Sequence, residues 1–545
     1  MSGRPRNGFA GTGRLLRLIL RLDRIKLSLW LVGLIVLIGI TPSSVRAVID
    51  NEAETQGVSS EQVLAEQAML LETNGASIAL QGPPDALDTF GGRFAFEIGA
   101  FTLAIVALMN ILLIGRHTRT EEETGRAELV RAAAVGPWSS LAAVGIVALA
   151  TNVILGGAIS TVFIADGQEV GRSLLYGASL AVCGLVFAAI ATIWVQVFEY
   201  SRPATGMSLA VVILAFAIRA VGDVRDNWLI VLSPLGWVQA VNAFGDAQAW
   251  PFIVAGVAIV AAVITAVVLA ARRDVGAGLV GSRPGPPQAG DSLATPLGFA
   301  WRLQQSTLLW WTVGAAALGA VYGSVISAIE DFADQNEGVR DMLEALGMSG
   351  DDLRNGFITV ILSLIAIIAT GGVIQTLLRP RSEEVAGRAE PVLGTAIGRR
   401  SWLSAHVAMT LLAAPLFMAA AGLAMALTDA ALVGGFVDFG GLMAAALARV
   451  PALWAVGGIG VLLYGWARRF TMGVWAVFVV GLIVFLFGEL LRLPDIAFNL
   501  SPVNHVTHLP GGDQSWLSVI VLSAIGLVTS VLGLLLFDRR DIDSA

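Results

Sequence analysis

The charged stretch RTEEETGRAELVRAAAVG at residues 119–136 reappears later in the chain as RSEEVAGRAEPVLGTAIG at residues 381–398. The two stretches share both members of a glutamate pair and the whole Gly-Arg-Ala-Glu block. Similarity of a chain to itself at a fixed separation is the signature of an internal repeat. These stretches therefore indicate that one unit occurs twice in the sequence.

The repeat extends on both sides of this stretch and keeps the same order. Upstream, RLDRIKLSLWLVG at 21–33 resembles RLQQSTLLWWTVG at 302–314. Downstream, LSPLGWV at 232–238 resembles LSPVNHV at 500–506. The whole chain is therefore predicted to be two tandem halves of common origin.

The composition indicates a membrane protein. Of the 545 residues, 56% are hydrophobic and only 14% are charged, with a mean hydropathy of +0.77, whereas a soluble domain carries roughly 25% charged residues. A spanning helix needs about 20 mostly apolar residues. We therefore predict an all-α polytopic membrane protein with twelve transmembrane helices, at residues 27–42, 94–115, 138–165, 173–198, 205–222, 251–271, 307–326, 356–378, 401–427, 442–466, 471–490 and 516–537.

The distribution of basic residues predicts the orientation. Twenty-five of the Arg and Lys residues fall in the terminal and even-numbered connections, and seven fall in the alternate set. Because basic residues favour the cytoplasmic side, both termini are expected in the cytoplasm of a multi-pass plasma (inner) membrane protein. Six spans per half give both halves the same orientation, so a pseudo-two-fold axis along the membrane normal is expected.

The predicted organisation has three parts. An N-terminal six-span half covers residues 1–271, a Gly- and Pro-rich cytoplasmic linker covers 272–298, and a C-terminal six-span half covers 299–545. The outer loops 43–93 and 328–355 are acidic with an amphipathic helical pattern, which predicts a folded cap.

An amphipathic helix is predicted before the first span. Arg14, Arg17, Arg21 and Arg24 recur at spacings of three and four residues, which puts them on one helix face. We expect residues 13–26 to form an interfacial helix on the cytoplasmic leaflet.

Few polar groups interrupt the predicted spans. Arg219, His406 and Arg449 are expected to be interfacial or snorkelling residues, and Asn110 and Gln375 to make helix-to-helix hydrogen bonds. No pair of carboxylates lies near a span centre, although such pairs are typical of proton relays.

Several kinds of chemistry are not expected. The only lysine is Lys26, so the chain has no P-loop, and we expect no ATPase or other enzyme activity in it. Cys183 is the single cysteine, and the His505/His508 pair lies in a predicted loop, so we expect no metal site. Nucleic acid is not an expected partner either.

The duplicated charged block is the main candidate site. Each copy is predicted to lie in the cytoplasm between the second and third spans of its half. We interpret the two copies as docking surfaces, because a connector needs polarity but not identity; the alternative is a solvated connector that retains an ancestral sequence. The candidate residues are Glu121, Glu122, Gly125, Arg126, Glu128, Glu383, Glu384, Gly387, Arg388 and Glu390.

The Glu-Glu-x-x-Gly-x-x-Glu block, behind an amphipathic N-terminal helix and within a six-span unit, resembles the ABC-2 type permeases of ATP-binding-cassette exporters. The fused twelve-span form with an acidic outer loop after the first span is similar to actinobacterial permeases that export polyketide antibiotics such as tetronasin. The resemblance implies two six-helix halves of the type V exporter fold. It also implies that residues 13–26 are the elbow helix and that the two blocks couple to an ATPase.

The same resemblance implies the partners. Two copies of a nucleotide-binding ATPase subunit would supply ATP and Mg to this multidrug efflux permease. The cargo is expected to be hydrophobic or amphipathic, for example antibiotics, drugs or lipids. The path is expected between the halves, lined by spans one, two and five and by spans seven, eight and eleven.

Three alternatives remain open. A proton-coupled twelve-span efflux transporter of the major facilitator type usually carries Gly-x-x-x-Asp-Arg-x-Gly-Arg after the second span, where this chain has GRHTRTEEETGR at 115–126. A membrane glycosyltransferase would use carboxylates such as Asp50, Glu52 and Glu54, but a single active site does not fit a duplicated unit. A non-transporting ABC-like sensor has the same sequence features as an exporter.

Overall fold

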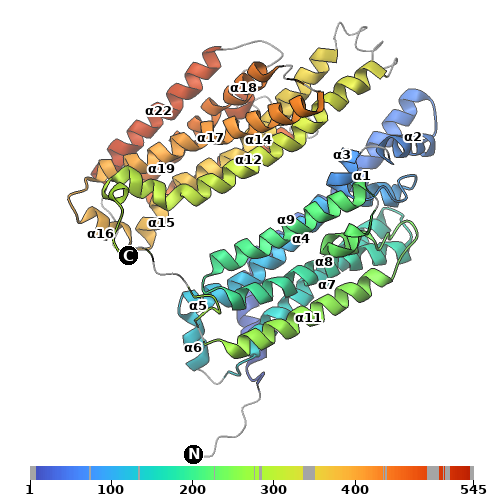
Figure 1. The fold of residues 1–545 in the computed structure, drawn as a ribbon, viewed down its shortest axis with the longest axis horizontal. Coiled ribbons are helices and arrows are strands. Elements are labelled where there is room, and N and C mark those ends of the chain that lie inside the picture. The colour runs from blue at the N-terminus through green and yellow to red at the C-terminus, as the bar shows by residue number, and fades with distance from the viewer. Residues whose placement is uncertain are drawn as a thin grey trace, which may run out of the picture. The chain divides into compact units, whose positions relative to one another are not determined.

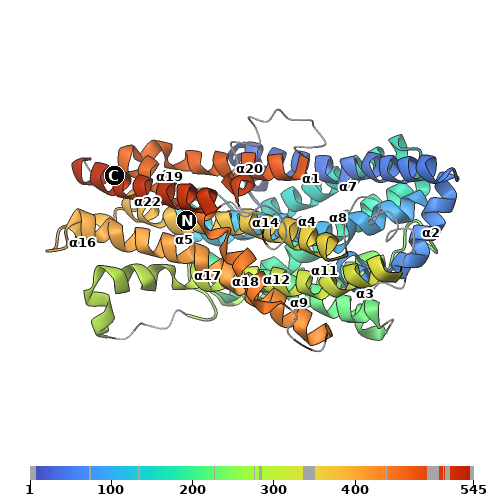
Figure 2. The same ribbon diagram turned by 90° about the horizontal axis from the view of Figure 1, so that it is seen from above.

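The computed structural model describes residues 8–72, 75–132, 135–225, 227–274, 276–281, 285, 287–335, 350–433, 435, 438–487, 502–506, 509 and 516–540. Over this part of the chain every regular element is a helix (Figure 1 and, turned by 90°, Figure 2). The chain divides into two compact units, residues 1–284 and 285–545. The division falls inside the predicted linker 272–298.

The first unit contains six long helices and several short ones. The long helices are α1 (Thr12–Gln56), α4 (Phe90–Gly115), α7 (Ser139–Ala165), α8 (Val170–Val197), α9 (Ser201–Val224) and α11 (Trp250–Arg272). The short ones are α2 (Ser60–Glu72), α3 (Gly75–Gln81), the π-helical turn η1 (Arg116–Thr120), α5 (Glu121–Glu123), α6 (Arg126–Ala132), η2 (Trp228–Leu232) and α10 (Pro234–Gln239).

The second unit follows the same order. Its longer helices are α12 (Pro296–Gln335), α14 (Gly350–Leu377), α17 (Arg399–Val433), α18 (Phe439–Leu447), α19 (Val450–Trp466), α20 (Val474–Phe487) and α22 (Trp516–Arg539). Its shorter ones are α15 (Arg379–Val385), α16 (Ala389–Leu393), η4 (Arg468–Gly473) and η5 (Pro502–His505), and η3 (Asp291–Ala294) precedes α12.

Ten helices of the described chain are long and apolar enough to cross a membrane. They coincide with ten of the twelve predicted spans, so a multi-pass, all-helical membrane protein is confirmed. The predicted span 307–326 lies within α12 and the predicted span 471–490 overlaps α20; neither is among the ten.

Corresponding helices have corresponding neighbours in the two units. In the first unit α1 packs on α7, and α8 contacts both α4 and α11. In the second unit α12 packs on α17, and α19 contacts both α14 and α22. The repeat in the sequence is thus also a repeat in helix packing.

Glycines allow the last contact of the second unit to be close. Gly458 and Gly465 of α19 face the backbone of Gly526 and Gly533 of α22, and a Cβ at any of the four would overlap atoms of the other helix. Lipid tails are as apolar as the surfaces of these helices, so the hydrophobic effect does not drive the helices together in a membrane. Small residues let two helices approach closely enough for dispersion contacts to hold them together.

Helix α1 differs from the expectation for residues 13–26. The predicted elbow helix and the first span are one continuous helix of 45 residues; the position of residues 13–26 at the cytoplasmic leaflet stays a prediction. No proline or glycine interrupts residues 14–32, and Lys26 and Leu27, which meet at the junction of the two predicted segments, are good helix formers.

The first outer loop is helical. Helix α1 continues to Gln56, and α2 packs Val63 and Leu64 against Ile49 and Ala53 of α1. Half of the second outer loop, residues 336–349, lies outside the described residues.

Candidate functional site

Each unit carries the duplicated block on a short helical hairpin, which we call the charged segment: residues 116–132 in the first unit and 379–393 in the second. The first charged segment follows α4 directly through η1, a π-helical turn of five residues. Single π-helical turns are rare and are frequent at functional sites. In the second unit α15 and α16 occupy the corresponding place after α14.

A left-handed glycine turns the chain at the same place in both charged segments. Gly125 has φ 73° and Gly387 has φ 69°. The Gly125 N–H donates to the Glu122 carbonyl at 3.1 Å, and the Gly387 N–H donates to the Glu384 carbonyl at 3.0 Å. Only glycine adopts this conformation without strain, which explains why the duplicated block contains it.

The first glutamate of each pair bonds across this turn to the arginine of the block. Arg126 Nη1 lies 3.4 Å from Glu121 Oε1. Arg388 donates to both carboxylate oxygens of Glu383, at 2.8 and 3.1 Å, and this hydrogen bonding raises the pKa of Arg388. The two predicted candidates are therefore brought together in each unit.

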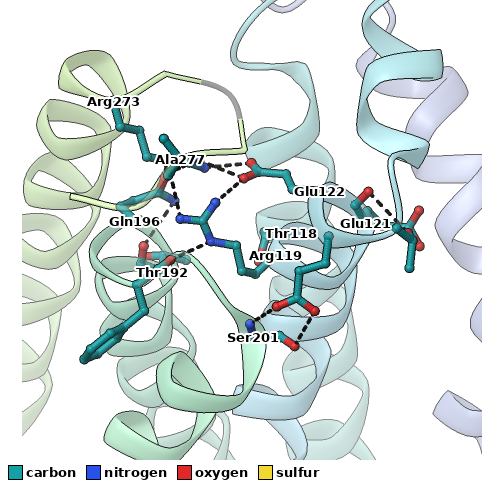
Figure 3. A network of polar contacts seen from close by, with 12 residues as sticks. Thr118, Arg119, Glu121, Glu122, Thr192, Gln196, Ser201, Arg273 and Ala277 are labelled. Carbon is teal, nitrogen blue, oxygen red and sulfur yellow. Dashed lines mark hydrogen bonds and ion pairs between the residues drawn. The ribbon is translucent and has the colours of Figure 1, made fainter. Parts of the chain in front are cut away.

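The second glutamate of the first charged segment is held by two arginines, a group we call the first clamp (Figure 3). Arg273 Nη2 donates to Glu122 Oε1 at 2.7 Å and its Nη1 donates to Oε2 at 2.8 Å. Arg119 donates to the same carboxylate and, through Nη2, to the Ala277 carbonyl at 2.9 Å. Arg273 Nε donates to Gln196 at 2.6 Å, which ties the end of α11 to α8.

In the second charged segment two side chains again hold the second glutamate, a group we call the second clamp. Arg540 takes the place of Arg273, and a tyrosine, Tyr464, takes the place of Arg119. Arg540 Nη2 lies 2.8 Å from both carboxylate oxygens of Glu384. The Tyr464 hydroxyl donates to Glu384 Oε2 at 2.7 Å, and Arg540 Nη1 donates to the Tyr464 carbonyl at 3.1 Å. Only 2% of the Glu384 side chain is exposed, so an uncompensated charge there would be costly.

Both clamps use the first residue after the last helix of their unit. Helix α11 ends at Arg272 and α22 ends at Arg539, and the clamp arginines are Arg273 and Arg540. Sequence reasoning missed both. Arg-Arg-Asp occurs at 272–274 and again at 539–541, but a match of three residues is too short to identify a repeat.

The outward surface of each charged segment combines apolar and charged residues. Leu129 is 76% exposed beside the exposed Glu128, and Val385 is 51% exposed near the exposed Glu390. Leu129 and Val385 are the exposed large apolar side chains that the structure describes on these two segments. The candidate block thus divides into inward residues, Glu122, Glu383 and Glu384, and outward ones.

The arginine face of α1 is where the sequence predicts it. Arg14, Arg17, Arg21 and Arg24 are all exposed. Sequence reasoning missed a buried acid on the opposite face of α1. This acid is Asp23, and its partners are Arg116 and His117 of η1.

This acid fixes α1 to the first charged segment. Asp23 Oδ1 lies 3.0 Å from Arg116 Nη1, and Oδ2 contacts His117 Nε2. The residue aligned with Asp23 in the repeat is Gln304, which is also buried and lies 2.9 Å from His406 Nδ1. In each unit a buried polar residue of the first helix therefore meets a histidine.

Two arginines of the predicted spans are buried with internal partners, so the expectation that they snorkel is wrong. Arg219 pairs with Asp223 at 2.9 Å. Arg449 donates to the Thr359 carbonyl at 2.8 Å. Both lie against neighbouring helices of their own unit, which supply partners that a lipid-facing position lacks.

The two amides behave as predicted. The Asn110 and Asn152 side chains exchange hydrogen bonds of 3.1 and 2.7 Å between α4 and α7. The Trp311 indole donates to Gln375 at 2.8 Å between α12 and α14. Both are helix-to-helix hydrogen bonds.

Many apolar helices in two units of like packing, each with the same charged hairpin beside its second long helix, define a multi-pass membrane protein built from a repeated unit. Comparison with known proteins agrees. The family model described as "Multidrug efflux system permease Rv1217c, C-terminal domain" matches residues 13–273 and 293–538. The multidrug efflux system permease protein Rv1217c of Mycobacterium tuberculosis (strain ATCC 25618 / H37Rv) is 34% identical over 541 residues, covering 98% of this chain and 96% of that protein.

The chain belongs to the Rv1217c family of multidrug efflux permeases. It is an efflux permease of the ABC type, as its resemblance to ABC-2 permeases predicts. The internal segment that the family model leaves unmatched, residues 274–292, lies within the predicted linker 272–298.

Proposed function

We propose that this chain is the transmembrane subunit of an ATP-driven ABC exporter. Two copies of a nucleotide-binding ATPase subunit, which holds ATP and Mg, dock on the two charged segments, one on each. The observation that carries the proposal is the shared construction of these segments: the same left-handed glycine, the same glutamate–arginine bond across it and a clamp on the second glutamate. A solvated connector needs none of these features twice.

The proposed topology has twelve spans in two six-span halves with a pseudo-two-fold relation. Both termini and both charged segments lie in the cytoplasm, since 25 of the basic residues fall on that side against seven on the other. The linker 272–298 then crosses no membrane.

The clamps suggest how movement passes from the ATPase to the membrane helices. When nucleotide closes the ATPase dimer, each charged segment moves with the subunit bound to it. Because Glu122 is joined to Arg273 and Glu384 to Arg540, the ends of α11 and α22 move with the segments. Nucleotide drives this movement only because it binds the open and the closed state of the transporter with different affinity.

The proposed cargo is a hydrophobic or amphipathic compound, such as an antibiotic, a drug or a lipid, and polyketides of the tetronasin kind belong to this class. The path is proposed between the halves, along spans one, two and five and spans seven, eight and eleven. The name of the relative supports export rather than uptake.

The test is copurification. We expect the full chain, extracted in mild detergent, to retain two copies of one P-loop ATPase per chain. The double variant Leu129→Asp/Val385→Asp places charge on the exposed apolar residues of both segments and should remove the ATPase while the permease remains folded. Glu122 and Glu384 are unsuitable for this purpose, since their reversal breaks the clamps.

The matched control is Met69→Asp, an exposed apolar residue of α2 outside the charged segments; it should retain both copies. Recovery of the chain without any ATPase, even after crosslinking, would contradict the proposal. The proton-coupled transporter and the non-transporting sensor would then explain the family features better.

A further inference from the structure

A cavity of about 260 Å³ lies beside the first charged segment. One wall is the apolar face of α1 near its start, a second is formed by residues 135–141, and the third by the charged segment and the end of α11. Pockets for drug-sized ligands start at roughly 300 Å³, so this cavity suits one chain or ring system with its head group.

The α1 wall is apolar and still partly open. Leu15, Leu18 and Leu22 lie on one helix face and all line the cavity. Leu18 is 43% and Leu22 is 50% exposed, and Trp138 adds an aromatic surface opposite. Covering such side chains is favourable by about 25 cal/mol per Å², so an occupant with an apolar part gains binding energy here.

The polar wall favours a positive group. Arg273 lines it, but its Nε is bonded to Gln196 and both of its Nη atoms are bonded to Glu122. Glu121 also lines the cavity, and Arg126, its partner at 3.4 Å, has a side chain that is 64% exposed. The acid Asp274 is exposed at the same edge. An anion could pair with Arg273 only by breaking its hydrogen bonds to Glu122. A cation could pair with the carboxylate of Glu121 and leave the first clamp intact.

We propose that this cavity binds an amphipathic cation, with its apolar part on Leu18, Leu22 and Trp138 and its positive group at Glu121. The inference rests on the proposed export function and specifies a class of cargo for it. Because the first charged segment forms one wall, an occupied cavity contacts the same element that docks the ATPase. The cavity is thus a loading site that the ATPase can sense.

The test uses the full chain alone, in nanodiscs of phosphatidylcholine, and three dansyl probes with the same decyl chain. The probes carry a quaternary ammonium, a neutral amide or a carboxylate as head group, and fluorescence anisotropy reports binding. We expect the ammonium probe to bind about tenfold more tightly than the carboxylate probe. The interaction with one nearby charge at a partly hydrated site contributes about 1.4 kcal/mol, which corresponds to a tenfold difference in affinity.

Two variants separate the contributions. Glu121→Gln should abolish the preference for the ammonium probe, and Leu22→Ser should weaken all three probes. Glu128→Gln, an exposed acid of the same segment that does not line the cavity, should change nothing. Leu22 and Glu121 are not buried, so neither variant is expected to disturb folding.

Equal binding of the three probes, or a preference that survives Glu121→Gln, would overturn the inference. Tighter binding of the carboxylate probe would overturn it as well and would indicate a site for anionic lipid. No ATPase is present in this assay, so its failure leaves the copurification result untouched, and loss of copurification leaves the binding result untouched.

Discussion

At the scale of the residue, the two clamps set the chemistry of the charged segments. Glu384 is 2% and Glu122 10% exposed at the side chain, and taking a carboxylate out of water costs several kcal/mol unless its partner is present. Arg273 and Arg540 therefore matter most as compensation for a buried charge. The glutamate pairs, the glycines and the block arginines could be predicted because they recur locally in the sequence. The clamp arginines could not, because only folding brings residues 151 and 156 positions apart together.

The clamp is testable by exchange of charges. Arg540→Glu should destabilise the protein by about 3–5 kcal/mol, because it leaves two acids facing each other in a buried site. The double exchange Glu384→Arg/Arg540→Glu should recover part of this loss. Thermal unfolding followed by fluorescence-detected size exclusion in detergent measures both.

The control is Glu390→Arg, on an exposed residue of the same charged segment, for which we expect an unchanged midpoint. If the double exchange were no more stable than Arg540→Glu alone, the ion pair would not be the source of the effect.

The left-handed turns give a second prediction at this scale. Gly125→Ala and Gly387→Ala should each cost about 1–2 kcal/mol from backbone strain alone, because no atom lies within 4 Å of the added methyl group in either case. Gly206→Ala provides the comparison: it is helical and equally open, so we expect a neutral or stabilising change in the unfolding midpoint. Equal effects at the three positions would contradict the strain argument.

At the scale of the element, hydropathy predicts where helices cross a membrane but not how far they continue beyond it. The spans 94–115 and 138–165 agree closely with α4 and α7, since about 20 apolar residues leave little choice of structure. Residues 13–26 and 27–42 belong to one helix because neither proline nor glycine lies at their junction, and hydropathy alone does not predict this continuity. The buried partners of Arg219 and Arg449 depend on neighbouring helices, which no local pattern reveals.

Helix packing provides the prediction at this scale. Gly526→Val should separate α22 from α19, because the added side chain would meet the backbone of Trp454. We expect a loss of about 1–3 kcal/mol, as for other overpacked interiors. Gly314→Val in α12 has no neighbour within 4 Å and should shift the unfolding midpoint much less; a similar loss at both sites would contradict the packing argument.

At the scale of the whole molecule, the duplication is the most informative feature. It predicts two units with a boundary in the Gly- and Pro-rich region, and the chain divides between residues 284 and 285. It also predicts that α1, α4 and α7 have counterparts in α12, α14 and α17, and the neighbouring pairs agree. Orientation in the membrane follows from a different signal, the basic residues of the connections, and stays a prediction.

The predicted orientation can be measured by labelling. Cys183 is buried and is the single cysteine of the sequence, so an introduced cysteine is the only accessible thiol. Glu61→Cys in α2 should react with a membrane-impermeant maleimide in intact cells. Glu390→Cys in the second charged segment should react only after lysis. The reverse pattern would invert the proposed topology and remove the charged segments from any cytoplasmic ATPase.

The position of the clamp arginines has a consequence for biosynthesis. Arg273 lies 151 residues after Glu122, which at ordinary translation speeds is roughly 8–30 s of synthesis. During that interval α7, α8, α9 and α11 are made, and until α11 is complete the carboxylate has only the guanidinium of the neighbouring Arg119. Pairing takes place only when the sixth helix has emerged, so the arginine acts as a completion signal for its half. A nascent chain that stalls earlier keeps Arg119 beside Glu122 but lacks the two hydrogen bonds that join the first charged segment to the end of α11.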